Sequence, residues 1–304
     1  MFKTFPEFSK LTLDDKAEYE ALIKSFPPIA DFSFATMMSW WNPLNSLGIS
    51  LLNDNLVIPY WIPGDDTYSG LSLVGTNKVD ESICTIFDYL RARGDPPVLV
   101  NVPELVIHNV QYPELFNFKE ERPSFDYILP TSKYFPLENV NGFRRAKIRK
   151  QLHQLAGVPV EVRPLHLSSL EDRDFLLAAA DKWWNKNLSS IGSVERESME
   201  TCIREADKLG ISNICLFVDG KLQGFCLFQY PSSDKEYVII NHIKATHKKR
   251  LSFELMAHLF AEYFTERGIE YVNINSDVGI LRLRMFMLTL GPTNFFRKYR
   301  IEPA

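Results

Sequence analysis

Apolar and polar positions alternate along the first half of the chain in a recognisable order. Residues 47–62 form two apolar runs joined by an Asn-Asp-Asn turn, which predicts a β-hairpin. A further strand is expected at 68–74. Residues 78–93 place their apolar side chains at helical spacing and end at Gly94, a helix stop signal. Residues 97–102 have the pattern of a buried strand.

The second half repeats this order. Residues 213–229 form two apolar strands around an Asp-Gly turn, one of the clearest short-range hairpin signals. A strand follows at 236–243, an amphipathic helix at 251–267 and another strand at 269–275. A tandem tryptophan precedes each hairpin, at Trp40-Trp41 and Trp183-Trp184. We therefore expect a weak structural repeat of hairpin, strand, helix and strand.

The length of the chain agrees with two copies of one fold. The chain has 304 residues, 45% of them hydrophobic and 24% charged, a composition that excludes wholesale disorder and collagen-like repeats. Between the copies, residues 143–155 predict a basic helix. We expect an α+β protein with a first domain at 1–130 and a second at 131–304, and the basic helix could belong to either.

Charge is distributed unevenly between the halves. Residues 1–136 carry 10 Lys and Arg against 18 Asp and Glu, whereas residues 137–304 carry 24 against 20. This asymmetry indicates either an anionic partner for the second half or a solvated surface.

Two basic clusters are candidates for binding an anion. Residues 144–150 contain five cations, including Arg144 and Arg149, which suit phosphates of a nucleotide, an RNA or a lipid headgroup, or form a solvated helix face. Residues 246–250 precede a helix, where backbone N–H groups and the helix dipole favour anions. This second cluster contains no glycine, which excludes a P-loop, and an exposed loop is the alternative.

Three further residues are candidates for chemistry. Asp277 follows a predicted strand directly and could be a general base, a group that orients a substrate, or a helix N-cap. His242 and Lys244 flank one residue of a strand, so they point to the same side. A hydrogen-bonded, half-buried histidine is the alternative for His242.

Several functional classes lack their signature. The six histidines show no metal-ligand spacing, so no metal is expected. Nucleophile elbows and glycine-rich dinucleotide fingerprints are also missing. No signal peptide and no apolar run of about 20 residues occurs. We expect a cytoplasmic protein without a transmembrane segment.

Five strings in the sequence are specific enough to compare with known families: DFSFATMMSWWNP, SFDYILP, GFRRAKIRKQL, HIKATHKKR and NINSDVGILRLR. The order of elements in 213–275 is similar to the GCN5-related N-acyltransferase (GNAT) fold. The strings resemble the soluble catalytic region of phosphatidylglycerol lysyltransferases and its stand-alone relatives, which contain two such domains in tandem. The resemblance covers nearly the whole chain and implies a donor substrate, acyl-CoA or aminoacyl-tRNA.

The resemblance also implies roles for individual residues. The oxyanion would be stabilised by backbone N–H groups near 241–245, and the donor phosphates would lie at the next helix. The implied catalytic residues are Asp277, His242 and Tyr299, the last as a proton donor or else a buried core tyrosine. The donor-binding residues are Lys244, Lys248, Lys249, Arg250 and Ser252, and the substrate-binding residues are Arg144, Arg149 and Arg284.

The chain departs from the relatives at several positions. These departures leave two functional hypotheses open. Relatives usually have glutamate where this chain has Ile243 and lysine where it has Met287. Either the chain transfers an acyl or aminoacyl group to an amine or hydroxyl acceptor, or it is a catalytically inactive anion-binding or regulatory module. We expect the donor in the second domain and a non-catalytic first domain. Partners would be the donor, including tRNA, and an anionic lipid surface.

Overall fold

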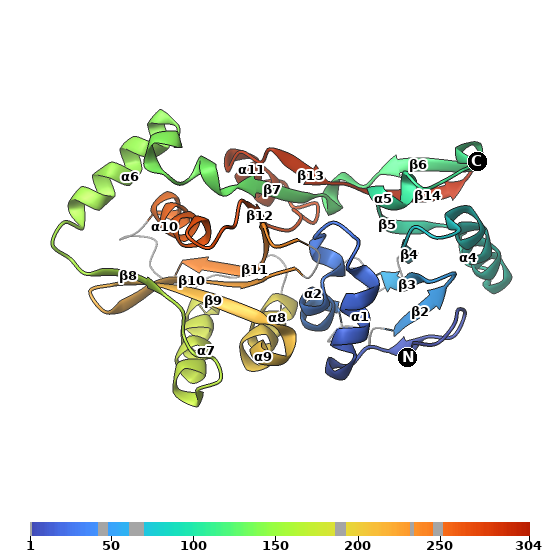
Figure 1. Cartoon of the computed structure of the whole chain (residues 1–304), viewed down its shortest axis with the longest axis horizontal. Coiled ribbons are helices and arrows are strands. Elements are labelled where there is room, and N and C mark those ends of the chain that lie inside the picture. Colours follow the sequence, from blue (N-terminus) through green and yellow to red (C-terminus); the bar gives the residue numbers. More distant parts are fainter. Residues whose placement is uncertain (1, 42–47, 61–69, 186–192, 232–233, 246–251) are drawn as a thin grey trace. The chain divides into compact units, whose positions relative to one another are not determined.

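The computed structural model describes residues 2–41, 48–60, 70–185, 193–231, 234–245 and 252–304 (Figure 1). The chain divides into two compact units. Unit 1 comprises Met1–Tyr127 and Ser276–Ala304, and unit 2 comprises Ile128–Asn275. Each unit is built around a mixed β-sheet.

The sheet of unit 1 has the order β1-β2-β3-β4-β5-β14-β6 among the described residues. Its neighbours are antiparallel except for β4 and β5, which are parallel. The strands are β1 (Ser9–Lys10), β2 (Gly48–Leu52), β3 (Asn55–Tyr60), β4 (Gly70–Val74), β5 (Leu99–Pro103), β6 (Phe116–Glu120) and β14 (Lys298–Pro303). The helices are α1 (Lys16–Ile23), α2 (Phe34–Thr36), α4 (Val79–Arg93), α5 (Glu104–Ile107) and α11 (Leu281–Thr289).

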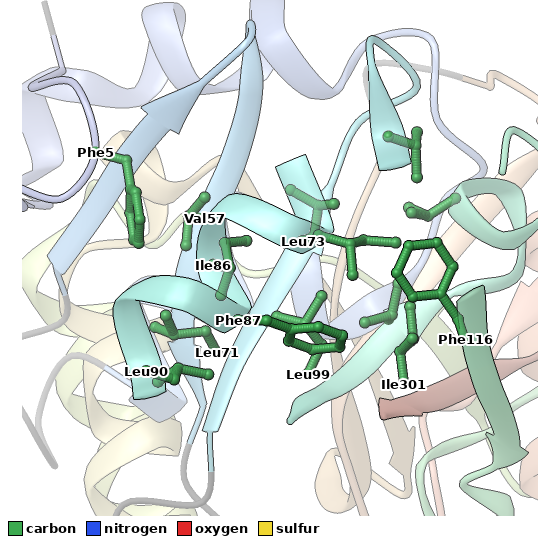
Figure 2. Packing of buried hydrophobic residues seen from close by; sticks show 14 residues of the cluster. Phe5, Val57, Leu71, Leu73, Ile86, Phe87, Leu90, Leu99, Phe116 and Ile301 are labelled. Carbon is green, nitrogen blue, oxygen red and sulfur yellow. The ribbon is translucent and has the colours of Figure 1, made fainter. Parts of the chain in front are cut away.

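Helix α4 forms the core of unit 1 together with the sheet. The apolar residues that gave its sequence a helical period are all buried, and they pack on side chains of β3, β4, β5 and β14 (Figure 2). The helix ends at Gly94, which adopts a left-handed conformation with φ of 80°. Burial of one continuous apolar stripe therefore fixes α4 on the sheet.

The second sheet has the order β13-β7-β12-β11-β10-β9-β8 among the described residues. Its strands are β7 (Asp126–Pro130), β8 (Val160–Arg163), β9 (Ile211–Val218), β10 (Lys221–Gln229), β11 (Tyr237–Ala245), β12 (Tyr271–Asn273) and β13 (Asn294–Phe296). Helix α10 (Phe253–Thr265) lies on one face of this sheet, and α7 (Leu170–Trp184), α8 (Ser193–Arg204) and α9 (Ala206–Leu209) lie on the other (Figure 1).

The basic helix α6 (Gly142–Gln154) belongs to unit 2. Ile148 is fully buried in the cluster that contains the apolar side chains of α10, and Leu152 and Leu155 pack against that cluster. The three residues share one helix face, as their spacing predicts, so α6 packs beside α10 and turns its remaining side chains outward.

The two sheets confirm the predicted repeat. In unit 1, β2, β3 and β4 pair antiparallel in sequence and β4 pairs parallel with β5. In unit 2, β9, β10 and β11 pair antiparallel and β11 pairs parallel with β12. Each predicted hairpin turn has two residues with positive φ, Asn53 and Asp54 in the first and Asp219 and Gly220 in the second. Such turns match the twist of the flanking strands.

The C-terminal segment departs from the expected division. We expected 131–304 to form the second domain, whereas Ser276–Ala304 belongs to unit 1. The physical reason is β14, which lies between β5 and β6 and forms antiparallel pairs with both. The hydrophobic pattern of a strand does not reveal which sheet it joins. Among the helices of the described residues, none has the length and hydrophobicity needed to cross a membrane.

Candidate functional site

Strands β11 and β12 of unit 2 separate part-way along their length. Their parallel pairing covers Tyr237–Ile239 and Tyr271–Asn273, whereas β11 continues to Ala245. At the point of separation, the Asn275 Nδ2 group donates a hydrogen bond of 2.5 Å to the Ile240 carbonyl oxygen. Asn275 has a φ of 63°, a left-handed conformation that asparagine tolerates better than most residues. The strand pairing thus ends at Ile239 and Asn273, and beyond it Asn275 contacts β11 through its side chain.

A β-bulge lies at the same point. Leu227 of β10 pairs with His242, but the next residue, Phe228, pairs with Ile240, so Asn241 is the extra residue. A bulge shifts the alternation of side chains. Consequently Ile240 and Ile243 both face the α10 side, while His242 and Lys244 point to the opposite side, towards α8.

Helix α8 supplies partners for both of those side chains. The His242 Nε2 atom lies 3.0 Å from Ser198 Oγ, and Lys244 Nζ lies 2.5 Å from Glu195 Oε1. Lys244 Nζ also lies 4.2 Å from the ring centroid of Trp183 in α7. Because Glu195 and Ser198 are one turn apart and His242 and Lys244 are two residues apart on a strand, the two pairs form a ladder between helix and sheet.

Burial and pairing determine the charge states of His242 and Lys244. Burial lowers the pKa of His242 well below its ordinary value of 6.5, and the charge of Lys244 lowers it further. His242 is therefore neutral at physiological pH. Lys244 is only 9% exposed and its charge is compensated by Glu195, so its ammonium is not an exposed cation for a donor phosphate. Sequence reasoning missed Glu195 and Ser198, whose i, i+3 spacing was the available signal.

The N-terminus of α10 lies at the far end of the β11–α10 connection. Ser252 is its N-cap: its Oγ accepts a hydrogen bond from Leu255 N and donates one of 2.6 Å to Gln151 Oε1 of α6. Lys248, Lys249 and Arg250, the predicted donor-binding cations, lie outside the described residues. Gly224 of β10 permits the close packing here, because a Cβ at this position would lie 2.6 Å from Met256 Sδ and 3.0 Å from the Lys244 carbonyl oxygen.

Helix α6 carries its cations next to this helix start. Lys147 Nζ forms an ion pair of 2.7 Å with Glu254 in the first turn of α10. The Arg144 guanidinium lies 5.5 Å from the ring centroid of Tyr134. Arg149 and Lys150 are exposed and have no hydrogen-bond or ion-pair partner among the residues that the structure describes. Arg149 is therefore the predicted substrate-binding cation that is most accessible to an anion.

Asp277 and Arg284 form a second polar centre, within unit 1. Arg284 donates Nε to Asp277 Oδ2 and Nη2 to Asp277 Oδ1, each at 2.9 Å. Tyr127 Oη donates a hydrogen bond of 2.5 Å to Oδ2, and Gly279 N donates one of 2.9 Å to Oδ1. Burial raises the pKa of Asp277, but the hydrogen bonds from Arg284 and Tyr127 outweigh burial, so the net pKa is lowered. Asp277 is a fully engaged carboxylate.

The geometry around Asp277 favours an orienting role over a general base. A base needs an oxygen that can take a proton from a substrate, and both oxygens of Asp277 already accept hydrogen bonds. The N-cap alternative does not hold, because α11 begins at Leu281 with Ile280 as its N-cap. Sequence reasoning missed Arg122, whose guanidinium lies 4.9 Å from the Tyr127 ring centroid and 3.5 Å from Asp277.

Tyr299 also lies in unit 1, on β14. Its hydroxyl donates a hydrogen bond of 3.2 Å to Glu104 Oε1, and burial raises its pKa. Tyr299 is therefore protonated at neutral pH. Of the three predicted catalytic residues, Asp277 and Tyr299 are in unit 1 and His242 is in unit 2.

Asn55 fills the strand-to-helix turn of unit 1 that corresponds to the β11–α10 connection. Its side chain accepts a hydrogen bond from Asn77 N and donates one of 2.6 Å to the Asn77 carbonyl oxygen. A Cβ at Gly75 would overlap the Asn55 side chain. The first turn of α4 also carries Asp80 and Glu81, which would repel an anion.

Comparison with known proteins identifies the family of the chain. The family model for the C-terminal region of phosphatidylglycerol lysyltransferase matches residues 29–280. The chain belongs to this family. A search of curated proteins gives no match.

Solved structures agree with this family on the fold. A protein of unknown function from Bacteroides thetaiotaomicron superposes with a TM-score of 0.79 at 22% identity, covering 100% of both chains. The structure of L-PGS from Bacillus licheniformis has a TM-score of 0.58 at 16% identity, covering 95% of this chain and 91% of that one. A tandem GNAT protein from the clavulanic acid biosynthesis pathway has a TM-score of 0.50 at 11% identity, covering 98% of both. This phosphatidylglycerol lysyltransferase family member is thus an α+β protein with two tandem GNAT-like units.

Proposed function

We propose that the chain transfers an acyl or aminoacyl group from a phosphate-bearing donor, acyl-CoA or aminoacyl-tRNA, to an amine or hydroxyl acceptor. The observation that carries the proposal is the separation of β11 from β12 together with the bulge at Asn241. A strand edge that leaves its neighbour offers backbone groups to a ligand carbonyl. Donors aimed at a developing oxyanion are the largest single contribution to catalysis of acyl transfer.

The start of α10 supports placing the donor phosphates in unit 2. A helix N-terminus attracts anions, and here it follows the separated strand and lies beside the cations of α6. In the proposal, Ser252, Lys248, Lys249 and Arg250 hold the phosphates, and Arg144 and Arg149 bind more distant anionic groups. The filled turn at Asn55 argues against a second donor site at the corresponding turn of unit 1.

Family membership supports the aminoacyl form of the reaction. The family name denotes transfer of a lysyl group to phosphatidylglycerol. By analogy, an aminoacyl-tRNA would be the donor and a lipid hydroxyl the acceptor. No nucleophilic side chain is required, because the acceptor attacks the donor carbonyl directly.

The candidate residues then take the following roles. In unit 2, His242 is neutral at physiological pH and can accept a proton. In unit 1, Asp277 orients Arg284, whose guanidinium can bind an anionic group. Lys244 is not available to hold a donor phosphate, because its ammonium is paired with Glu195.

A thermal-shift screen with CoA, acyl-CoAs and uncharged tRNA tests the donor site. A ligand at one hundred times its Kd stabilises the protein by about 2.7 kcal/mol and raises its Tm. The double substitution Arg149→Glu/Lys150→Glu should reduce the shift. Lys235→Glu, an exposed charge reversal near the opposite end of β11, should leave it unchanged. If no phosphate-bearing ligand shifts the wild-type protein, the proposal is wrong.

A binding module without catalysis is the second candidate. The Glu195–Lys244 pair favours it, because that pair neutralises a cation that a catalytic site could use. Single-turnover transfer from a radiolabelled acyl or aminoacyl donor separates the two candidates. A donor that shifts the Tm but never loses its acyl group would support the binding module.

A further inference from the structure

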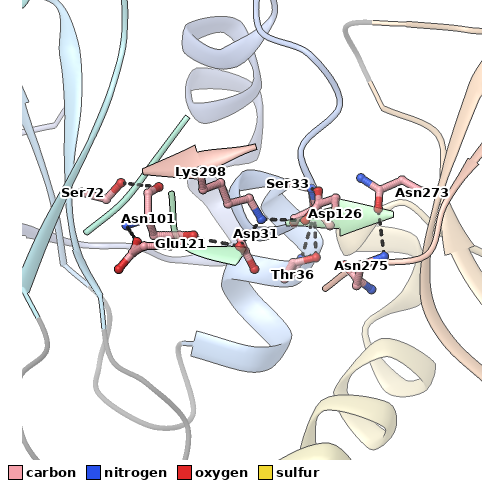
Figure 3. A network of polar contacts seen from close by, with 11 residues as sticks. Asp31, Ser33, Thr36, Ser72, Asn101, Glu121, Asp126, Asn273, Asn275 and Lys298 are labelled. Carbon is pink, nitrogen blue, oxygen red and sulfur yellow. Dashed lines mark hydrogen bonds and ion pairs between the residues drawn. The ribbon is translucent and has the colours of Figure 1, made fainter. Parts of the chain in front are cut away.

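Unit 1 contains a buried polar cluster that the proposed function does not use. The cluster comprises Asp31, Asn101, Glu121, Asp126 and Lys298 (Figure 3). The Lys298 Nζ atom lies 2.5 Å from Asp31 Oδ2 and 2.6 Å from Asp126 Oδ1. The side chains of Lys298 and Asp126 are both fully buried, whereas the Asp31 side chain is 14% exposed. Asp126 and Lys298 therefore form the floor of the cluster and Asp31 part of its rim.

Asn101 connects the rim to the sheet. Its φ of 54° is left-handed, and its backbone N–H donates a hydrogen bond of 2.5 Å to Glu121 Oε2. Ser72 of β4 donates its hydroxyl to the Asn101 carbonyl oxygen at 3.1 Å. Leu71 and Leu99 form the parallel pair just before these residues, so Asn101 lies where β4 and β5 separate. Asn275 has the equivalent position in unit 2.

The cluster contains more carboxylates than cations. Asp31 and Asp126 contact the ammonium of Lys298, and Glu121 lies in the field of Lys298 and of Arg300, whose guanidinium is also paired with Glu302. Burial raises the pKa of Glu121, and it raises the pKa of Asp126 despite the adjacent Lys298. Buried carboxylates that lack a full counter-charge either take up a proton or bind a cation. The cluster is thus electrostatically suited to one more positive charge.

An unpaired acceptor faces the same cluster. The Asn101 Oδ1 atom is buried and has no hydrogen-bond partner among the described residues, although the side chain is fully buried. The carboxamide orientation is set by its other end, because Nδ2 donates to Asp31 Oδ2 at 3.2 Å. Reversing the amide would place two oxygens against each other. A buried acceptor without a donor is destabilising, so a donor at this point would be stabilising.

The arrangement of acceptors discriminates between kinds of cation. Among the described residues, no three His, Cys, Asp or Glu side chains converge closely enough to hold a metal ion. An ammonium group instead has three N–H donors, which match separate acceptors on Asp31, Asn101 and Glu121. Lys298 already demonstrates that Asp31 accepts this type of group.

We propose that unit 1 binds the primary ammonium group of a small molecule beside Asp31, Asn101 and Glu121, of which Asp31 and Glu121 are the partly exposed members. The site is separate from the donor site of unit 2 and does not depend on transferase activity. The ligand places its R–NH₃⁺ group against Asn101 Oδ1 and the two carboxylates, and its remaining atoms extend outward past Glu121, which is half-buried.

Isothermal titration calorimetry of the full chain tests the proposal with n-butylammonium chloride at constant ionic strength. Tetramethylammonium chloride, which has charge but no N–H group, and butan-1-ol, which has neither charge nor ammonium, are the matched ligand controls. The expected result is saturable binding of n-butylammonium alone. Glu121→Gln should weaken binding about tenfold, because the carboxamide keeps an acceptor oxygen but loses the negative charge that attracts the ammonium.

Asn101→Gly provides a second variant that preserves the backbone. Glycine tolerates the left-handed φ of this position, so the substitution removes the side chain without backbone strain. Binding should again weaken about tenfold. Glu114→Gln removes an exposed carboxylate of unit 1 and should leave affinity unchanged. Absence of saturable binding, equal binding of tetramethylammonium, or wild-type affinity in both site variants would overturn the proposal.

Discussion

Arg284 holds Asp277 through two parallel hydrogen bonds, Nε to Oδ2 and Nη2 to Oδ1, each 2.9 Å long. This fork geometry fixes the direction of the guanidinium and occupies both carboxylate oxygens. Tyr127 and Gly279 complete the hydrogen bonding of the same carboxylate. Asp277 therefore acts by fixing the orientation of the Arg284 guanidinium.

Asp277→Asn should destabilise the protein by about 1–3 kcal/mol, because the buried carboxylate accepts charge-assisted hydrogen bonds from Arg284, although the partly exposed guanidinium can be hydrated after the substitution. Urea denaturation measures the change. Asp88→Asn is the control: Asp88 is exposed and pairs with Arg91 at 2.9 Å, so its loss should cost less than about 1 kcal/mol. Asp277→Asn should also abolish turnover while leaving the donor-induced thermal shift intact. If stability and turnover were both unchanged, Asp277 would have neither a structural nor a catalytic role.

His242 should make stability depend on pH in the mildly acidic range. Its folded pKa lies well below 6.5, so the unfolded chain binds a proton that the folded chain does not. Stability should be full above pH 6.5 and fall as the pH drops below it, with a slope of at most about 1.4 kcal/mol per pH unit. His242→Gln should remove this component, whereas exposed His153→Gln should keep it. Chemical denaturation at a series of pH values gives the comparison.

The Glu195–Lys244 pair should behave as a coupled unit. Glu195→Gln or Lys244→Met alone should cost about 3 kcal/mol, because each leaves a buried group without its partner. The double substitution should cost less than the sum of the two. A double-mutant cycle measures the coupling energy. Additive effects would show that the two side chains do not interact in solution.

Gly224→Ala should destabilise unit 2 by about 1–3 kcal/mol, because the new methyl group must displace Met256 or the β11 backbone at Lys244. The same substitution at Gly142, the first residue of α6, meets no atom within 4 Å and should be neutral or stabilising. Thermal melts of both variants provide the test. A Gly224→Ala protein with wild-type Tm would mean that this packing is looser than the structure indicates.

Local signals in the sequence predicted much of the fold. The Asn-Asp and Asp-Gly turns fix both hairpins because their residues tolerate positive φ, and the helical period of α4 together with Gly94 fixes that helix and its end. The family strings predicted the tandem arrangement. These features depend on neighbouring residues alone, so a single sequence contains them.

The features that the sequence did not predict depend on contacts between residues that are far apart in the chain. The Asn241 bulge arises from the register of β11 on β10, which the apolar run of β11 does not specify. Glu195 meets Lys244 only because α8 packs on that face of the sheet. Lys244 and Asp277 were recognised from their positions and Arg284 from the family resemblance. Their partners decide whether each is an exposed charge or a buried, paired one.

The position of β14 has a consequence for synthesis on the ribosome. Residues 298–303 form a strand between β5 and β6, so the first sheet lacks an internal strand until nearly all of this sequence has been translated. All residues of unit 2 emerge earlier, and of the strands described in the second sheet only its edge strand β13 emerges as late as β14. Unit 1, which begins the sequence, is therefore completed last. Unit 2 can begin to fold before strand β14 of unit 1 has been translated.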